Sequence, residues 1–252
     1  MATPILPHRP VVVAHRGASG EAPENTLAAF RRAVELGGDA VELDVQLSAD
    51  GEPVVIHDDL LDRTTDGRGL VKDQSLAALR RLDAGRWFHE RFAGECIPTL
   101  AEALALLRPV RVIIEIKNCP ISHPGIASRV AGIIREAGHT NVTVSSFDHP
   151  VLLEVRAAAP EIPTAVLFFA RPVDPVRLAA DAAAAILHPQ WFFLTPGMVA
   201  AAHAAGLRIE TWIVDEVAHM AHVAAMGVDG IISNHPARLM AFLAGAPPGP
   251  AK

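Results

Sequence analysis

Cysteines and long apolar runs are scarce in this sequence of 252 residues, and each shortage excludes a class of protein. The two cysteines, Cys96 and Cys119, are too few for a disulfide framework, and no zinc-binding pattern surrounds them. We interpret them as buried packing residues of a protein from the reducing cytoplasm. The apolar runs are too short to span a bilayer, and residues 1–10 lack the apolar segment of a secretory signal.

An excess of basic residues is also missing. The net charge of −6 and the pI near 6.0 argue against a general binder of nucleic acid or anionic membranes, which would present a basic face. A small anionic substrate remains compatible with this charge, because a metal ion or a few cations can reverse the field inside a cleft. The oligomeric state, monomer or homodimer, is left open.

Strand patterns and helix patterns alternate along the chain, which is typical of a parallel sheet. The strand patterns lie at residues 11–14, 40–47, 112–116, 142–145, 164–168, 184–188, 208–214 and 230–233. The helix patterns lie at residues 25–36, 99–107, 125–137, 150–158, 175–182, 196–205, 216–226 and 236–243. Eight such units and 50% hydrophobic residues predict a single (β/α)8 TIM barrel over residues 1–252. An open doubly wound sheet is the alternative.

Residues 45–98 interrupt this alternation. Asp50-Gly51 indicates a turn, residues 54–56 form an apolar return strand, and a charged, glycine-rich stretch follows. We predict a hairpin and small cap inserted after the second strand, with apolar residues that either face a lipid substrate or form a small core. These residues are Leu70, Val71, Leu76, Leu79, Leu82, Trp87 and Phe88. Residues 244–252, which contain Pro-Pro-Gly-Pro, are expected to form a disordered tail.

Polar residues stand at or near the carboxyl ends of several predicted strands, where buried strands are normally apolar. Alternation along a strand places Glu42 and Asp44 on one side of the second strand, and the hairpin returns His57 beside them. We therefore expect a polar cluster at one rim of the barrel, although a single member such as His188 could instead be a hydrogen-bonded core residue. The cluster comprises His15, Arg16, Glu42, Asp44, His57, Glu115, Lys117, His188, Glu210 and Trp212.

The carboxylates in this cluster suggest a metal site. Glu42, Asp44 and Glu115 offer hard oxygen ligands, which suit Mg²⁺ or Ca²⁺ and also accept Mn²⁺.

The remaining charged and titratable groups suggest chemistry at phosphorus. Arg16 and Lys117 are fixed cations suited to phosphate oxygens. His15 and His57 titrate near neutrality, as an acid and a base acting on a phosphorus centre must.

Short motifs in order along the chain resemble those of the glycerophosphodiester phosphodiesterases. The resemblance extends from about residue 11 to residue 236, and although HRG alone would be weak, the ordered set is specific. The motifs are HRG at 15–17, PENT at 23–26, ELDV at 42–45, VIHD at 55–58, LDRTTDG at 61–67, IPTL at 97–100, IEIK at 114–117 and SSFD at 145–148.

The resemblance implies a barrel that hydrolyses glycerophosphodiesters, such as glycerophosphocholine or glycerophosphoethanolamine, to glycerol 3-phosphate and an alcohol. It implies that His15 and His57 form the general acid/base pair and that Trp212 lines the glycerol side of the cleft. It also implies a metal held by Glu42, Asp44 and Glu115, and phosphate bound by Arg16 and Lys117. From its strand position alone, we expect His188 to face the same cleft.

Two departures from the family pattern affect other positions. The family commonly has Trp-Thr-Val-Asn where this chain has WIVD at 212–215, and Thr-Asp-Arg-Pro or Thr-Asn-Tyr-Pro where it has SNHP at 233–236. We associate these departures with specificity for the alcohol or glycerol side, because they miss the metal and histidine positions.

Three readings of the function remain besides this one. A lysophospholipase D or an opine-sugar phosphodiesterase would use the same scaffold. A non-catalytic barrel that binds phosphorylated metabolites is less favoured, because every rim histidine and carboxylate is present. The leaving alcohol, the metal and a cyclic phosphate intermediate are left open, and neither a nucleic-acid partner nor stable membrane insertion is expected.

Overall fold

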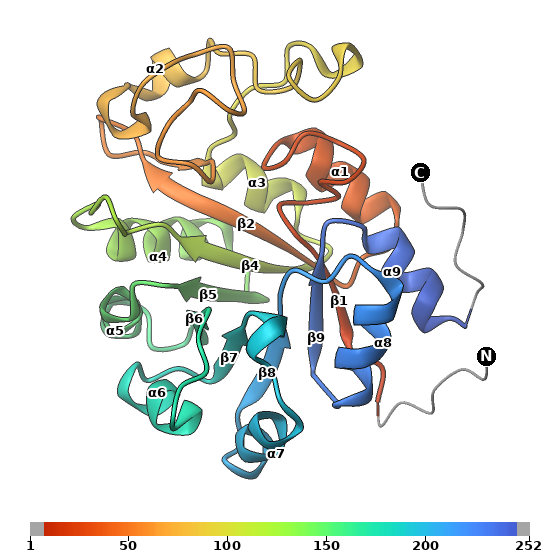
Figure 1. Cartoon of the computed structure of the whole chain (residues 1–252). Helices are drawn as coiled ribbons and strands as arrows, with labels where there is room; N and C mark the ends of the chain where they lie inside the picture. The colour runs from red at the N-terminus through yellow and green to blue at the C-terminus, as the bar shows by residue number, and fades with distance from the viewer. Residues whose placement is uncertain (1–7, 246–252) are drawn as a thin grey trace.

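The computed structural model describes residues 8–245, so the expectations for residues 1–7 and 246–252 lie outside the described part. Its eight parallel strands form a closed sheet in which β1 pairs with both β2 and β9 (Figure 1). This closure confirms the TIM barrel and excludes the open sheet. The strands are β1 Val11–Ala14, β2 Ala40–Leu47, β4 Arg111–Ile116, β5 Val142–Ser146, β6 Thr164–Phe168, β7 Ile186–Pro189, β8 Arg208–Thr211 and β9 Gly230–Ser233.

Helices surround the barrel and cover the outer face of its strands (Figure 1). Local signals define where they begin: Thr26 caps α1, and Thr99 forms a capping box with Glu102 at α3. None of the helices in the described residues is long and apolar enough to cross a membrane. The helices are α1 Leu27–Glu35, α3 Leu100–Leu106, α4 Ile126–Ala137, α5 His149–Ala158, α6 Pro175–Asp181, α7 Pro196–Ala204, α8 Val217–Ala225 and α9 Pro236–Leu243.

The predicted insertion after the second strand is confirmed. Strand β3, Pro53–Val55, pairs antiparallel with β2, and the short helices η1 Val71–Asp73, α2 Leu76–Leu79 and η2 Glu90–Phe92 follow. The insertion has its own apolar cluster, against which Leu76 and Leu82 pack, whereas Trp87 is exposed. The cluster consists of Val54, Ile56, Leu61, Val71, Leu79, Ala84 and Ile97.

Side-chain parity along β2 determines what faces the barrel interior. Val41, Leu43 and Val45 belong to the main apolar core beneath the helices. Glu42 and Asp44 therefore point to the opposite side, into the barrel, as the alternation predicts. Asp44 is paired in register with Glu115 on β4.

Glu210 does not belong to the rim cluster, which corrects the expectation from sequence. It is fully buried and paired in register with Gly230, the first residue of β9, where an added Cβ would approach Glu210 Cγ to 3.0 Å. Its carboxylate bonds Arg111 Nη1 at 2.7 Å and lies 3.2 Å from His188 Nε2. Although burial alone would raise the pKa of Glu210, His188 and Arg111 lower it to about 2. Glu210 is therefore part of an ionic core below the cleft.

The loop after β1 requires a glycine at position 17. Arg16 and Gly17 both have positive φ, 54° and 81°, and a Cβ at Gly17 would lie 2.6 Å from the carbonyl carbon of Ala29. The loop therefore turns tightly against α1. This turn directs the Arg16 amide to Glu42 Oε2, at 3.0 Å.

Gly17→Ala should destabilise the protein by about 2–4 kcal/mol, because it combines backbone strain with a steric overlap. Gly37→Ala is the matched control, since Gly37 has a φ of 79° but no atom within 4 Å of its added Cβ. It should cost only about 1–2 kcal/mol from left-handed strain. Urea unfolding measures both free energies. Equal losses of unfolding free energy in the two variants would show that the contact with Ala29 does not contribute.

Candidate active site

The structure gathers the nine predicted site residues at the carboxyl ends of the strands. Eight of them line a small inner pocket of about 70 Å³, and Asp44 lies fully buried beside Glu42 and Glu115. His57 arrives on the segment after β3, and Trp212 follows β8, which ends at Thr211 rather than at the predicted residue 214. The eight are His15, Arg16, Glu42, His57, Glu115, Lys117, His188 and Trp212.

Glu42, Asp44 and Glu115 form a compact acidic cluster whose ligand atoms lie within 4.8 Å of one another. Burial and the neighbouring carboxylates raise the pKa of Glu42 well above its ordinary value. Burial also raises the pKa of Glu115, against the opposing effect of Lys117. For Asp44, Lys117 and Arg16 outweigh burial and lower the pKa. Three buried carboxylates in one place thus need additional positive charge to be ionised together.

Two cations contact this acidic cluster directly. Lys117 Nζ lies 3.0 Å from Asp44 Oδ1 and also contacts Glu115, and Arg16 Nε lies 3.2 Å from Asp44 Oδ2. Burial would lower the pKa of Lys117, but Asp44 and Glu115 raise it, so its ammonium remains charged. The cluster therefore already has a strong affinity for positive charge.

Hydrogen bonds with Asn25 fix the orientation of Asp44. Asn25 Nδ2 donates to Asp44 Oδ2 at 2.7 Å, and the Asp44 amide donates to Asn25 Oδ1 at 3.3 Å. Such partners orient metal ligands in proteins. Three carboxylates on two neighbouring strands, with ligand atoms within 4.8 Å of one another, fit a hard divalent cation. The chemistry of the set does not distinguish Mg²⁺, Ca²⁺ and Mn²⁺.

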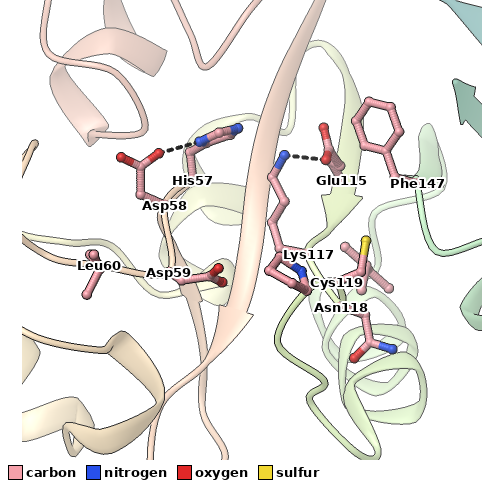
Figure 2. Close-up of a pocket in the computed structure, with 11 residues that line it drawn as sticks. His57, Asp58, Asp59, Leu60, Glu115, Lys117, Asn118, Cys119 and Phe147 are labelled. Atoms are coloured by element: carbon pink, nitrogen blue, oxygen red, sulfur yellow. Dashed lines mark hydrogen bonds and ion pairs between the residues drawn. The ribbon is translucent and has the colours of Figure 1, made fainter. Parts of the chain in front are cut away.

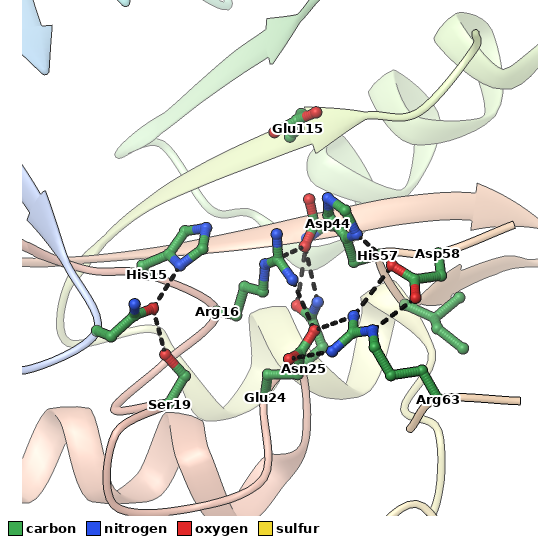
Figure 3. Close-up of polar contacts among 12 residues, drawn as sticks. His15, Arg16, Ser19, Glu24, Asn25, Asp44, His57, Asp58, Arg63 and Glu115 are labelled. Carbon is green, nitrogen blue, oxygen red and sulfur yellow. Dashed lines mark hydrogen bonds and ion pairs between the residues drawn. The ribbon is translucent and has the colours of Figure 1, made fainter. Parts of the chain in front are cut away.

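His57 is held by a chain of charged groups that links the insertion to the loop after β1 (Figure 3). Its Nδ1 lies 2.6 Å from Asp58 Oδ1, and Arg63 bridges Asp58 to Glu24. Glu24 in turn accepts a hydrogen bond from Arg16 at 2.7 Å. Hydrogen bonding from Arg63 is the main cause that lowers the pKa of Asp58 to about 2. Because a carboxylate only accepts, His57 Nδ1 donates to Asp58, and a neutral ring then has its free lone pair on Nε2.

His15 is held by a different kind of partner. Its Nδ1 lies 2.7 Å from Asn234 Oδ1, and its Nε2 lies 3.9 Å from Glu42 Oε2. Burial, followed by the charge of Arg16, lowers the pKa of His15 to about 4, so its imidazole is neutral at pH 7. Asn234 lies in the SNHP motif at 233–236, one of the two departures from the family pattern that we associate with substrate specificity. The structure places it against a predicted catalytic side chain instead.

A wider cleft of about 440 Å³ opens beside the inner pocket. His57 and Asp59 lie on one side of it and Lys117, Glu115 and Phe147 on the other (Figure 2). The two cavities therefore share four lining residues, which are His57, Glu115, Lys117 and Phe147.

Aromatic side chains gather around Phe147, which lines both the inner pocket and the outer cleft. Phe147 packs edge-on against Phe169 and Trp212, with centroid separations of 5.8 and 5.5 Å. Trp212 Nε1 donates to the carbonyl oxygen of His188 at 2.8 Å, which holds the indole in place.

The prediction of two buried cysteines is wrong. Cys119 is exposed in the outer cleft, and Cys96 is partly buried. Cys119 lies in the loop after β4, and Cys96 lies within the insertion, between η2 and α3.

The comparisons with known proteins agree with this geometry. The sequence model described as the glycerophosphoryl diester phosphodiesterase family matches residues 15–238, which include every predicted site residue. The chain belongs to the glycerophosphoryl diester phosphodiesterase family. It is accordingly a phosphoric diester hydrolase.

Relatives of this phosphodiesterase match along nearly their whole length. A glycerophosphodiester phosphodiesterase of Caldanaerobacter subterraneus subsp. tengcongensis is 43% identical over 233 residues, covering 91% of this chain and 96% of the relative. A solved glycerophosphodiester phosphodiesterase from Agrobacterium tumefaciens is 35% identical, with a TM-score of 0.82 and coverage of 94% and 100%. A phosphodiesterase from Oleispira antarctica, solved in complex with the product sn-glycerol-3-phosphate, is 32% identical, with a TM-score of 0.86 and coverage of 93% and 97%.

The sequence assigns no catalytic or binding role to several residues that this phosphodiesterase site contains. Glu24, Asn25, Asp58 and Arg63 lie inside the quoted motifs, so the motifs signal their importance. Arg63 meets Glu24 only when the insertion packs against the loop after β1, and Asn25 meets Asp44 only when that loop packs against β2. Phe147 is signalled in the same way, since it follows β5 within the motif at 145–148.

Proposed function

We propose that this phosphodiesterase hydrolyses glycerophosphodiesters, such as glycerophosphocholine or glycerophosphoethanolamine, to glycerol 3-phosphate and an alcohol, with one divalent cation as cofactor. The observation that carries the proposal is the placement of two imidazoles, each held through Nδ1, beside one buried cluster of carboxylates and cations. The glycerol 3-phosphate product bound to the Oleispira antarctica phosphodiesterase supports the identity of the product.

His15 and His57 would act as the general acid/base pair. One imidazole takes the proton from the attacking oxygen, which is water or the substrate's own glycerol hydroxyl, as this oxygen bonds to phosphorus. Attack by the hydroxyl would give a cyclic phosphate, which water would then open to glycerol 3-phosphate. The other gives a proton to the alcohol oxygen as the phosphorus–oxygen bond breaks. Because both rings are hydrogen-bonded through Nδ1, each would present Nε2 to the substrate.

Glu42, Asp44 and Glu115 would hold the divalent cation, which when bound supplies positive charge to stabilise negative charge on the phosphate oxygens. Arg16 and Lys117 would bind phosphate oxygens directly, since both are fixed in the cluster.

The remaining side chains would shape the site. Trp212 would line the glycerol side of the inner pocket, with His188 at its floor. The wider outer cleft would accept the leaving alcohol.

Release of glycerol 3-phosphate from glycerophosphocholine should stop when EDTA removes the metal and return when Mg²⁺, Ca²⁺ or Mn²⁺ is added back. The reason is that the acidic cluster lacks the cation that balances its charge. A coupled assay for glycerol 3-phosphate measures the rate. Full activity in EDTA, with metal absent by elemental analysis, would contradict the role of the carboxylates.

A lysophospholipase D activity is the second candidate, favoured by apolar side chains at the mouth of the outer cleft. Leu60 is 49% exposed and lines that cleft, and Phe169 is 65% exposed beside Phe147. Choline release from lysophosphatidylcholine and from glycerophosphocholine distinguishes the two candidates, because the substrates differ by one acyl chain and both yield choline. The assay for glycerol 3-phosphate does not detect the acylated product that lysophosphatidylcholine leaves. The non-catalytic barrel loses its support once the chain belongs to a family of hydrolases and keeps every predicted catalytic side chain.

A further inference from the structure

A chain of hydrogen bonds connects Asp215, in the loop after β8, to His15 through Asn234, in the loop after β9. Asn234 Nδ2 donates to Asp215 Oδ2 at 2.7 Å, and the Asn234 backbone amide donates to Asp215 Oδ1 at 2.8 Å. Ser233 Oγ also donates to Asp215 Oδ1, at 2.9 Å. Three donors thus fix the Asp215 carboxylate, which in turn fixes the Asn234 side chain.

The partners of Asn234 determine which way its amide points. An ionised carboxylate only accepts hydrogen bonds, so the NH₂ group of Asn234 must face Asp215. Its carbonyl oxygen Oδ1 then faces the opposite side, where Ser19 Oγ donates to it at 2.9 Å and His15 Nδ1 lies 2.7 Å away (Figure 3). Since a carbonyl oxygen only accepts, His15 Nδ1 must be the donor.

This assignment leaves one tautomer for His15. A neutral imidazole carries one proton, and if that proton is on Nδ1, Nε2 has the free lone pair. Nε2 is the atom that lies towards Glu42, and the ring lines the inner pocket.

The backbone around Asn234 holds this arrangement in place. The His15 amide donates to the carbonyl oxygen of Ser233, and the Gly20 amide donates to that of Asn234, both at 2.9 Å. Gly20 also packs closely, because a Cβ there would lie 2.3 Å from the ring of His235. The loops after β1 and β9 therefore form one packed unit.

We propose that Asn234, anchored by Asp215, is a positioning residue that fixes the ring of His15 and its Nδ1–H tautomer, so that Nε2 faces the reacting group. The catalytic consequence rests on the proposed function, whereas the tautomer itself does not. His57 is held in the same tautomer by Asp58, but there the acceptor is a carboxylate. Both imidazoles thus donate through Nδ1, His15 to a neutral amide oxygen and His57 to a charged carboxylate.

The tautomer can be observed by ¹H–¹⁵N correlation NMR of the ¹⁵N-histidine-labelled protein at about pH 8, above the ordinary histidine pKa of ~6.5. The His15 signals are assigned by their absence in His15→Gln. We expect the Nδ1–H pattern in the wild type and its loss in Asn234→Leu. Ser19→Ala is the matched control, because it removes the other donor to Asn234 Oδ1 and leaves the acceptor of His15 intact.

An exchange of the two side chains provides the rescue. Asn234→Asp alone places two carboxylates against each other and should disturb the His15 ring. Combined with Asp215→Asn, it should restore the Nδ1–H pattern, because the amide then donates to the carboxylate that accepts from His15.

Kinetics provide a second readout. On glycerophosphocholine, Asn234→Leu should lower kcat by about 100-fold with little change in KM, since misplacement of a reacting group acts on the chemical step. Ser19→Ala should stay close to the wild type. An Nε2–H pattern in the wild type, or an unchanged pattern in Asn234→Leu, would overturn the proposal. Should the wild type fail to hydrolyse glycerophosphodiesters, the NMR result still decides the positioning role, and the failure belongs to the proposed function.

Discussion

Replacing His57 with glutamine should lower turnover of glycerophosphocholine by about 10²–10⁴-fold, the range that general acid/base catalysis contributes. The ring is partly exposed at the cleft, and its Nδ1 bonds the adjacent Asp58, so its loss removes a proton-transfer group without opening the core. We therefore expect the melting temperature to stay within a few degrees of the wild type. Measurement of kcat beside a thermal melt separates the two effects.

His222→Gln is the control for this variant, because His222 is exposed on α8, outside the cleft. It should leave turnover unchanged. Asp58→Asn should give an intermediate loss, because the amide keeps a partner near Nδ1 but removes the charge that stabilises a protonated ring. Near-normal turnover in His57→Gln would refute the acid/base role of His57.

Replacing Glu115 with glutamine should weaken divalent-cation binding and lower turnover by about 10²–10³-fold, comparable to the removal of one strong electrostatic contact in a transition state. Glu115 is one of three buried carboxylates whose ligand atoms converge, and it is paired in register with Asp44, so the amide cannot supply the same charge. Wild-type protein should gain about 2.7 kcal/mol of stability at a metal concentration of 100 Kd. Calorimetric titration measures the metal affinity, metal-dependent melting measures the gain in stability, and the glycerol 3-phosphate assay measures turnover.

Asp59→Asn is the matched comparison for Glu115→Gln. It removes one negative charge from the outer cleft, but Asp59 is not part of the carboxylate cluster. Metal affinity should therefore change much less in Asp59→Asn. Equal losses in the two variants would show that the cleft attracts the cation by its overall charge rather than through three specific ligands.

The alternation of strands and helices could be predicted because each element is encoded locally, by apolar periodicity and by capping residues such as Thr26 and Thr99. The acidic cluster could be predicted for a related reason. Strand parity fixes the direction of Glu42 and Asp44, and barrel topology brings the strand ends together.

What could not be predicted depends on how distant strands are aligned. Glu210 shares its strand pattern with rim residues, but the register of β8 with β9 places it opposite Gly230, low in the barrel. Asn234 meets His15 across 219 residues, through the pairing of β1 with β9. Neither the position of a residue along the barrel axis nor the register between strands that are distant in sequence leaves a periodic signal in the sequence.

The insertion after β2 divides the reactive groups between two parts of the chain. Strands of the barrel carry the carboxylates, whereas His57 and Asp58 belong to a segment with its own apolar cluster. Local opening of that segment would withdraw one imidazole while the eight strands remain closed, because sub-global opening follows such separate clusters. The enzyme in that opened state would be folded yet inert. The population of that state would depend on the packing of Val54, Ile56 and Leu61, so substitutions that never touch the substrate would change the active fraction of the enzyme.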